Sequence, residues 1–235
     1  MEYLKQFWDL IFPKKCINCK KEGSYLCEDC LSLKEINPYR YCLCERMEKK
    51  DKCDVCKNRY LDKLFSAASF ENRILKEAVH KFKYGYIKDL SHPLSILILS
   101  HLQILEVNLD QSVIIIPVPM TDKKKRRRGF NQSEEMAKII SRATGIPLLS
   151  DVLIKNKETA PQMELNKKER MENIKKCFEI KNQEKIKGKT ILLLDDVYTT
   201  GSTMEECAKK LKQSGAAKVW GMTIAREVDQ KAYFV

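Results

Sequence analysis

The pattern of apolar and polar positions is clearest toward the end of the chain. Residues 191–194 form an unbroken apolar run, which is typical of a strand buried on both faces of a parallel sheet. A polar segment follows, and the apolar positions of residues 204–213 then recur at helical spacing up to the stop signal Gly215. Because residues 218–225 form another apolar run, we expect a βαβ unit whose polar loop lies at the carboxyl end of its first strand.

Similar patterns earlier in the chain predict the other elements of this sheet. Residues 64–70 and 113–118 are expected to be strands. A helix is expected to begin at Asn72, because the apolar residues after it share one face, and a second helix is expected to end at about Leu105. The alternation over residues 62–235 therefore predicts an α/β domain with a mostly parallel sheet flanked by helices.

The cysteines are concentrated before this domain. Eight of the ten are Cys16, Cys19, Cys27, Cys30, Cys42, Cys44, Cys53 and Cys56. A C-x-x-C pair directs two sulfurs at one point, and two such pairs can bind one Zn²⁺ tetrahedrally. We therefore expect residues 1–61 to form a zinc-binding module with one or two Zn²⁺, the pairs being matched sequentially or in interleaved order. Disulfides are the alternative, but the acidic residues Glu2 and Asp9 argue against a signal peptide and hence against export.

Charge and hydropathy narrow the class of partner. The formal net charge is +12 at pH 7, which favours acidic ligands such as phosphates or nucleic acid. No apolar run approaches the ~20 residues of a membrane-spanning helix. A cytoplasmic protein without a transmembrane segment is therefore expected.

The polar loop of the βαβ unit carries the candidate binding chemistry. Backbone N–H groups at the start of a helix favour an anion, hydroxyl side chains add donors, and Gly201 lets the backbone approach a phosphate closely. Asp195 and Asp196 would repel that phosphate, so we expect them to accept hydrogen bonds from sugar hydroxyls or to act through Mg²⁺. The candidate residues are Asp195, Asp196, Val197, Tyr198, Thr199, Thr200, Gly201, Ser202 and Thr203. The alternative is an ordinary strand–turn–helix connection with a polar loop.

A basic run is a second candidate. It consists of Lys123, Lys124, Lys125, Arg126, Arg127 and Arg128. It lies between a predicted strand and a helix for which Asn131 is the expected N-cap. This position predicts that the run reaches the same carboxyl edge of the sheet as the loop and binds pyrophosphate or nucleic acid. The alternative is a solvated charged segment.

Residues 195–203 carry the pattern D-D-x-x-T-T-G-x-T, which resembles the phosphoribosyl pyrophosphate (PRPP) motif of type I phosphoribosyltransferases. The resemblance implies a type I phosphoribosyltransferase-like fold and a PRPP site that uses Mg²⁺. It implies that residues 199–203 hold the 5′-phosphate, that Asp195 and Asp196 bind the ribose hydroxyls as the catalytic pair, and that pyrophosphate lies by residues 117–121. No P-loop sequence occurs.

A narrower resemblance is carried by Arg-Gly-Phe-Asn-Gln at 128–132, Pro-Val-Pro at 117–119 and Thr-Ala-Pro-Gln at 159–162. These segments are similar to the signature of the ComF family, phosphoribosyltransferase-like proteins associated with DNA uptake in naturally competent bacteria. The cysteine-rich start of the chain also fits this family. The resemblance implies a role in DNA uptake and natural transformation, with single-stranded DNA and other DNA-uptake proteins as partners. By position, residues 155–173 correspond to the loop that closes over PRPP, and the alternative is an ordinary surface connection.

Two function classes follow. The first is phosphoribosyl transfer from PRPP, a reaction with an oxocarbenium-like transition state that needs no covalent nucleophile. The second is a nucleic-acid-binding protein that keeps the phosphoribosyl-binding fold without transfer chemistry. No acceptor pocket is recognisable in the sequence, and a PRPP-sensing regulator is a weaker third possibility.

Overall fold

The computed structural model describes residues 13–32, 36–38, 43, 56–156 and 177–227. Its main sheet has four parallel strands in the order β1-β6-β5-β2. They are β1 (Lys63–Ser69), β2 (Val113–Pro117), β5 (Thr190–Tyr198) and β6 (Lys218–Arg226). The predicted βαβ unit is therefore confirmed, with its strands side by side at the centre of the sheet.

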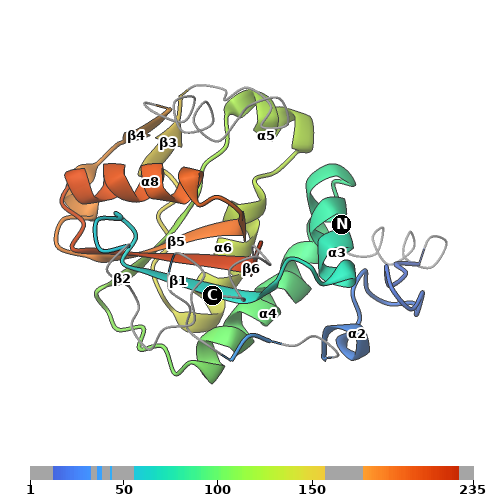
Figure 1. Ribbon diagram of the computed structural model, residues 1–235. Coiled ribbons are helices and arrows are strands. Elements are labelled where there is room, and N and C mark those ends of the chain that lie inside the picture. The colour runs from blue at the N-terminus through green and yellow to red at the C-terminus, as the bar shows by residue number, and fades with distance from the viewer. Residues whose placement is uncertain (1–12, 33–35, 39–42, 44–55, 157–176, 228–235) are drawn as a thin grey trace.

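Helices cover both faces of this sheet (Figure 1). On one face lie α3 (Arg73–Tyr84), α4 (Ser91–Ile104) and α6 (Gln132–Thr144), and on the other lies α8 (Ser202–Gln213). Strand β5 supplies both cores, because successive strand residues point to opposite faces. Leu192 and Leu194 belong to the apolar cluster under α4 and α6, whereas Ile191 and Leu193 belong to the cluster under α8.

The boundaries of the elements follow from local chemistry. The Oδ1 atom of Asn72 accepts a hydrogen bond from the N–H of Leu75 at 3.2 Å and so caps α3, as predicted. The basic run forms a short helix, α5 (Asp122–Arg128), which ends at Gly129 with a φ of 80°. A left-handed residue at this position lets the chain turn directly into α6, whose cap is Asn131.

Smaller elements complete the described part of the chain. They are α2 (Glu28–Ser32), the 3₁₀ helices η1 (Lys88–Leu90) and η3 (Gln183–Lys185), and an antiparallel hairpin of β3 (Leu153–Lys155) and β4 (Phe178–Ile180). Among the described helices, none combines the length and apolar character needed to cross a membrane.

Cysteine-rich segments pack against this domain at two places. Cys16, Ile17 and Leu26 belong to the apolar cluster under α4 and α6. Leu43 and Cys56 belong to the cluster under α8. The division into modules 1–61 and 62–235 remains a prediction.

Candidate functional site

The loop after β5 lines a cavity of about 170 Å³ together with the start of α8. The cavity is lined by Lys83 and by residues 195–204. Gly201 is the N-cap residue of α8, so the first turn of this helix has no capping side chain at that position. The hydroxyls of Thr200 and Ser202 lie 2.9 Å apart. Backbone donors and hydroxyls therefore converge where the positive end of the helix dipole lies, an arrangement that suits an oxyanion.

Gly201 is required at this point for two reasons. Its φ is 74°, in the left-handed region, and an added Cβ would overlap the hydroxyl and ring of Tyr198. Tyr198 is buried, and its hydroxyl accepts a hydrogen bond from Nη1 of Arg59 at 3.1 Å. Tyr60, which follows Arg59 in the sequence, donates its backbone N–H to Oε2 of Glu205 in α8 at 2.9 Å. The loop is thus supported from behind by a segment far away in the sequence.

The two carboxylates lie at the end of β5 and are held differently. Oδ1 of Asp195 accepts hydrogen bonds from the hydroxyl of Ser133 at 3.0 Å and from the N–H of Asp196 at 2.9 Å. Oδ1 of Asp196 accepts from the N–H of Val197 at 2.7 Å and pairs with Nζ of Lys83 at 2.8 Å. Burial, together with the charge of Asp196, raises the pKa of Asp195 to about 7.

Lys83 is a site residue that the sequence analysis missed. Burial would lower its pKa, but the carboxylate of Asp196 outweighs this effect and raises it. The carbonyl of the preceding residue, Phe82, accepts a hydrogen bond from Nε2 of Gln132 at 3.1 Å, which fixes the end of α3 against the start of α6. In the sequence, Lys83 follows the core residue Phe82, but Lys76 and Lys212 likewise follow core residues, so no local signal singles Lys83 out.

The structure brings the basic run and the loop to the same edge of the sheet and divides the run into two faces. Lys124 and Arg128 are half-buried and line a second cavity, of about 160 Å³, together with Lys83, Asp195 and Asp196. They lie one helical turn apart and therefore share a face of α5. The other members of the run, Lys123, Lys125, Arg126 and Arg127, are exposed.

The four cysteines of the first predicted set converge on one point. The sulfurs of Cys16, Cys19, Cys27 and Cys30 all lie within 4.8 Å of one another. Nδ2 of Asn18 donates a hydrogen bond to the sulfur of Cys30 at 3.2 Å. Burial would raise the pKa of Cys16, but hydrogen bonds from three backbone N–H groups outweigh it and lower the pKa to about 6. This set of donors fits a cation that is bound by four thiolates.

Of the second predicted cysteine set, the structure describes only Cys56. Cys56 is fully buried and begins a turn in which its carbonyl accepts a hydrogen bond from the N–H of Arg59 at 2.9 Å. Its predicted partners Cys42, Cys44 and Cys53 lie outside the described residues. The predicted closing loop, 155–173, also lies outside them except for residues 155 and 156.

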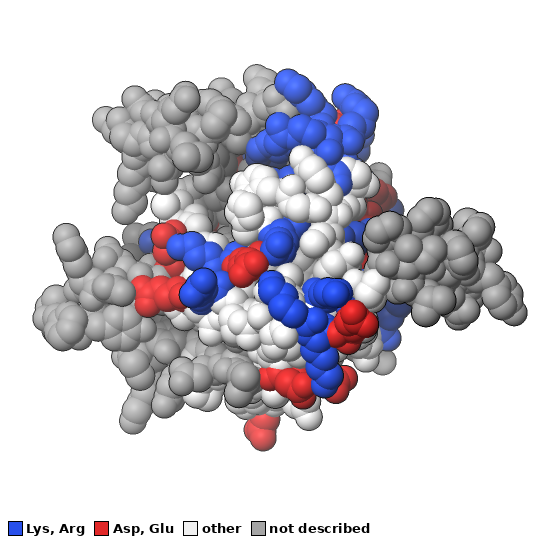
Figure 2. Space-filling view, turned by 90° about the vertical axis from the view of Figure 1, so that its right-hand side faces the viewer, with Lys and Arg blue, Asp and Glu red and all other residues white. Residues whose placement is uncertain are grey.

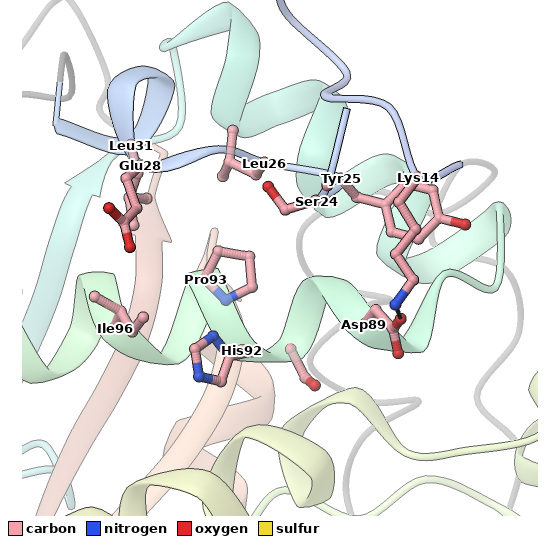
Figure 3. Close-up of a pocket in the computed structure, with 12 residues that line it drawn as sticks. Lys14, Ser24, Tyr25, Leu26, Glu28, Leu31, Asp89, His92, Pro93 and Ile96 are labelled. Carbon is pink, nitrogen blue, oxygen red and sulfur yellow. Dashed lines mark ion pairs between the residues drawn. The ribbon is translucent and has the colours of Figure 1, made fainter. Parts of the chain in front are cut away.

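A larger cavity, of about 480 Å³, lies between the four-cysteine segment and α4. Figure 3 shows Lys14 and Asp89 facing each other at one side of it, with their charged atoms 2.5 Å apart. Tyr25, Pro93 and Ile96 supply apolar surface. The residues that line it include neither the carboxylate pair nor any residue of α5, so it is separate from the site at the sheet edge.

Comparisons with known proteins identify several similar sequences. The model of the phosphoribosyl transferase domain family matches residues 103–232. Competence protein F of Haemophilus influenzae is 36% identical over 114 residues, which cover 47% of this chain and 50% of that protein. Competence protein ComFC of Bacillus subtilis is 28% identical, over 88% of this chain and 86% of that protein. DNA utilization protein YhgH of Escherichia coli K12 is 32% identical, over 62% and 64%. The chain thus spans only half to about two-thirds of the length of several curated relatives.

Proposed function

The chain belongs to the phosphoribosyl transferase domain family, and from this premise we propose that it binds PRPP with Mg²⁺ and uses this site in DNA uptake. The curated relatives are competence and DNA utilization proteins, which confirms the resemblance to the ComF family. The proposal about the ligand rests on one observation. The glycine-capped start of α8, the carboxylate pair and the basic face of α5 line two cavities that share Lys83, Asp195 and Asp196.

Each part of PRPP has a chemically suitable counterpart. The 5′-phosphate accepts hydrogen bonds from the backbone and hydroxyls of residues 199–203, next to the helix dipole. The ribose hydroxyls donate to Asp195 and Asp196, charge-assisted bonds that a phosphate could not make. The pyrophosphate lies in the second cavity, where Lys124 and Arg128 offer positive charge.

The same arrangement suits transfer chemistry. When the bond from C1 to pyrophosphate lengthens, positive charge develops on the ribose ring and negative charge on the leaving group. The carboxylates would stabilise the first charge, and Lys124 and Arg128 the second. Mg²⁺, when bound, would supply further neutralisation of the pyrophosphate, and Asp195 and Asp196, which line the second cavity, would offer it oxygen ligands.

Calorimetry tests the proposal before an acceptor is known. Wild-type protein with Mg²⁺ is expected to bind PRPP, and ribose 5-phosphate more weakly, because the latter fills only the loop and the carboxylate pair. Inorganic pyrophosphate should compete with PRPP but not with ribose 5-phosphate. If neither millimolar PRPP nor millimolar ribose 5-phosphate gives a heat of binding, the loop of the βαβ unit does not bind these ligands and the proposal is overturned.

We further propose that Zn²⁺ is the cation of the four-cysteine cluster. Metal analysis of purified protein is expected to give at least one Zn²⁺ per chain, bound by Cys16, Cys19, Cys27 and Cys30. Cys16→Ser should lose this ion and destabilise the segment around it, because metal binding and folding are coupled. Cys207→Ser is the matched control, since Cys207 is a buried cysteine far outside the cluster in sequence. A folded protein free of metal would contradict the prediction.

A second candidate function, binding of single-stranded DNA, is favoured by the exposed face of α5. Lys and Arg side chains gather there, at the top of Figure 2. Replacing Arg126 and Arg127 by Gln is expected to weaken DNA binding and to reduce the slope of log affinity against log salt by about 0.7 for each phosphate of the single strand that these arginines neutralise. The pair Lys124→Gln and Arg128→Gln should instead weaken pyrophosphate binding. Equal salt slopes in the wild type and the Arg126/Arg127 variant would show that this face is merely solvated.

A further inference from the structure

An exposed aromatic ring stands at the rim of the second cavity. Tyr84, the last residue of α3, is 55% exposed although it is a large aromatic residue. The guanidinium carbon of Arg128 lies 5.3 Å from the centre of its ring, and the ring of His80 lies 4.9 Å away at 44°. Tyr84 and Arg128 both line the cavity that contains Lys83 and Lys124. Two flat π-surfaces, one of them cationic, therefore border a space that is lined by lysines and by the carboxylate pair.

This pair is held in place before any ligand arrives. Nη1 of Arg128 donates to Oε1 of Gln132 at 3.0 Å, and the amide of the same Gln132 donates to the carbonyl of Phe82 at 3.1 Å. Phe82 packs on Phe130 with ring centres 5.5 Å apart. The ends of α3 and α5 are thus joined through one buried glutamine. A ligand that stacks here does not have to order two loose side chains, which reduces the entropic cost of binding.

We propose that Tyr84 and Arg128 form a stacking site for a nucleobase whose phosphate lies in the adjoining cavity. Planar heteroaromatic rings stack well on tyrosine and on guanidinium groups. Lys124, on the same face of α5 as Arg128, offers positive charge to a phosphate in the cavity. The proposal rests on the proposed function, because it extends the same phosphate-binding cavity. The base can belong to a free nucleotide or to a single strand of DNA, and the chemistry recognised is the same.

The test combines two variants of Tyr84 with a probe that lacks the bases. Binding of a short single-stranded oligothymidylate is compared with binding of an abasic strand of equal length and charge. Tyr84→Ala is expected to weaken binding of the oligothymidylate by about five- to a hundredfold, the usual effect of one aromatic stacking partner. The abasic strand should bind the wild type and Tyr84→Ala equally. Tyr84→Phe, which keeps the ring, should bind as the wild type does.

Further measurements identify the source of the base and distinguish failure of the stacking site from failure of the PRPP site. Tyr86→Ala is the matched control, since Tyr86 is 49% exposed and lies outside the cavity lining. If thymidine monophosphate also loses affinity in Tyr84→Ala, the site accepts free nucleotides; if only the strand does, it serves DNA. Ribose 5-phosphate should bind the wild type and Tyr84→Ala equally, and its failure to bind the wild type would count against the PRPP site alone. Equal affinity of the wild type and Tyr84→Ala for both base-containing probes would overturn the stacking site.

Discussion

Replacing Asp195 or Asp196 by asparagine is expected to lower PRPP affinity by about ten- to a hundredfold. At pH 8, above the pKa of about 7 of Asp195, a charge-assisted hydrogen bond contributes about 1.5–3 kcal/mol, and the neutral amide keeps only part of it. Asp196→Asn also removes the ionic partner of Lys83, whose Nζ lies 2.8 Å from the carboxylate. Calorimetric titration with PRPP and Mg²⁺ measures both effects.

The control for this prediction is a ligand without ribose. Inorganic phosphate should bind the wild type and both Asn variants with nearly equal affinity, because it contacts the loop at residues 199–203 and not the carboxylate pair. Equal loss of phosphate and PRPP binding would indicate a damaged loop. Unchanged PRPP binding in both variants would mean that the carboxylates only shape the turn before α8.

The same substitution changes the pH dependence of stability. The pKa of Asp195 rises from 3.8 in the unfolded chain to about 7 in the folded protein. Between these values the folded state holds a proton that the unfolded state has released, so the free energy of unfolding falls as pH rises through this window. Asp195→Asn cannot ionise, so its melting temperature should fall less between pH 4 and pH 8 than that of the wild type. We therefore expect the variant to lose ligand affinity and to show a flatter profile of melting temperature against pH than the wild type.

The sheet was predictable because its strands are buried on both faces. An uninterrupted run such as residues 191–194 has few alternatives once Gly215 marks the end of the following helix. The position of the binding loop then followed from the rule that loops at the carboxyl ends of parallel strands share one edge of the sheet.

The side chains contributed by distant elements were not predictable in this way. Lys83 reaches Asp196 from the end of α3, which Gln132 of α6 holds through the carbonyl of Phe82, and no local pattern encodes that contact. The basic run has no apolar periodicity, so its sequence does not reveal which members face the site. Once it folds as α5, the spacing of one turn selects Lys124 and Arg128. Arg59, which donates a hydrogen bond to the hydroxyl of Tyr198, likewise could not be identified from the sequence.

Gly201→Ala is expected to abolish measurable binding of ribose 5-phosphate and PRPP and to lower the melting temperature. Two costs add. A residue with a side chain at φ 74° costs about 1 kcal/mol or more, and the new methyl group overlaps Tyr198, which is buried and bonded to Arg59. Because the loop must move to relieve the overlap, the N–H groups at the start of α8 no longer converge on the phosphate.

A matched glycine separates these two costs. Gly145 has the same φ of 74°, but an added Cβ would meet nothing within 4 Å, and this residue ends α6 away from the loop. Gly145→Ala should therefore lose only the backbone contribution to stability and keep full affinity for ribose 5-phosphate. The double variant Tyr198→Ala with Gly201→Ala should recover part of the lost affinity, because removing the ring makes room for the methyl group. Equal melting temperatures and equal affinities for Gly145→Ala and Gly201→Ala would show that the contact between Tyr198 and Gly201 does not shape the phosphate loop.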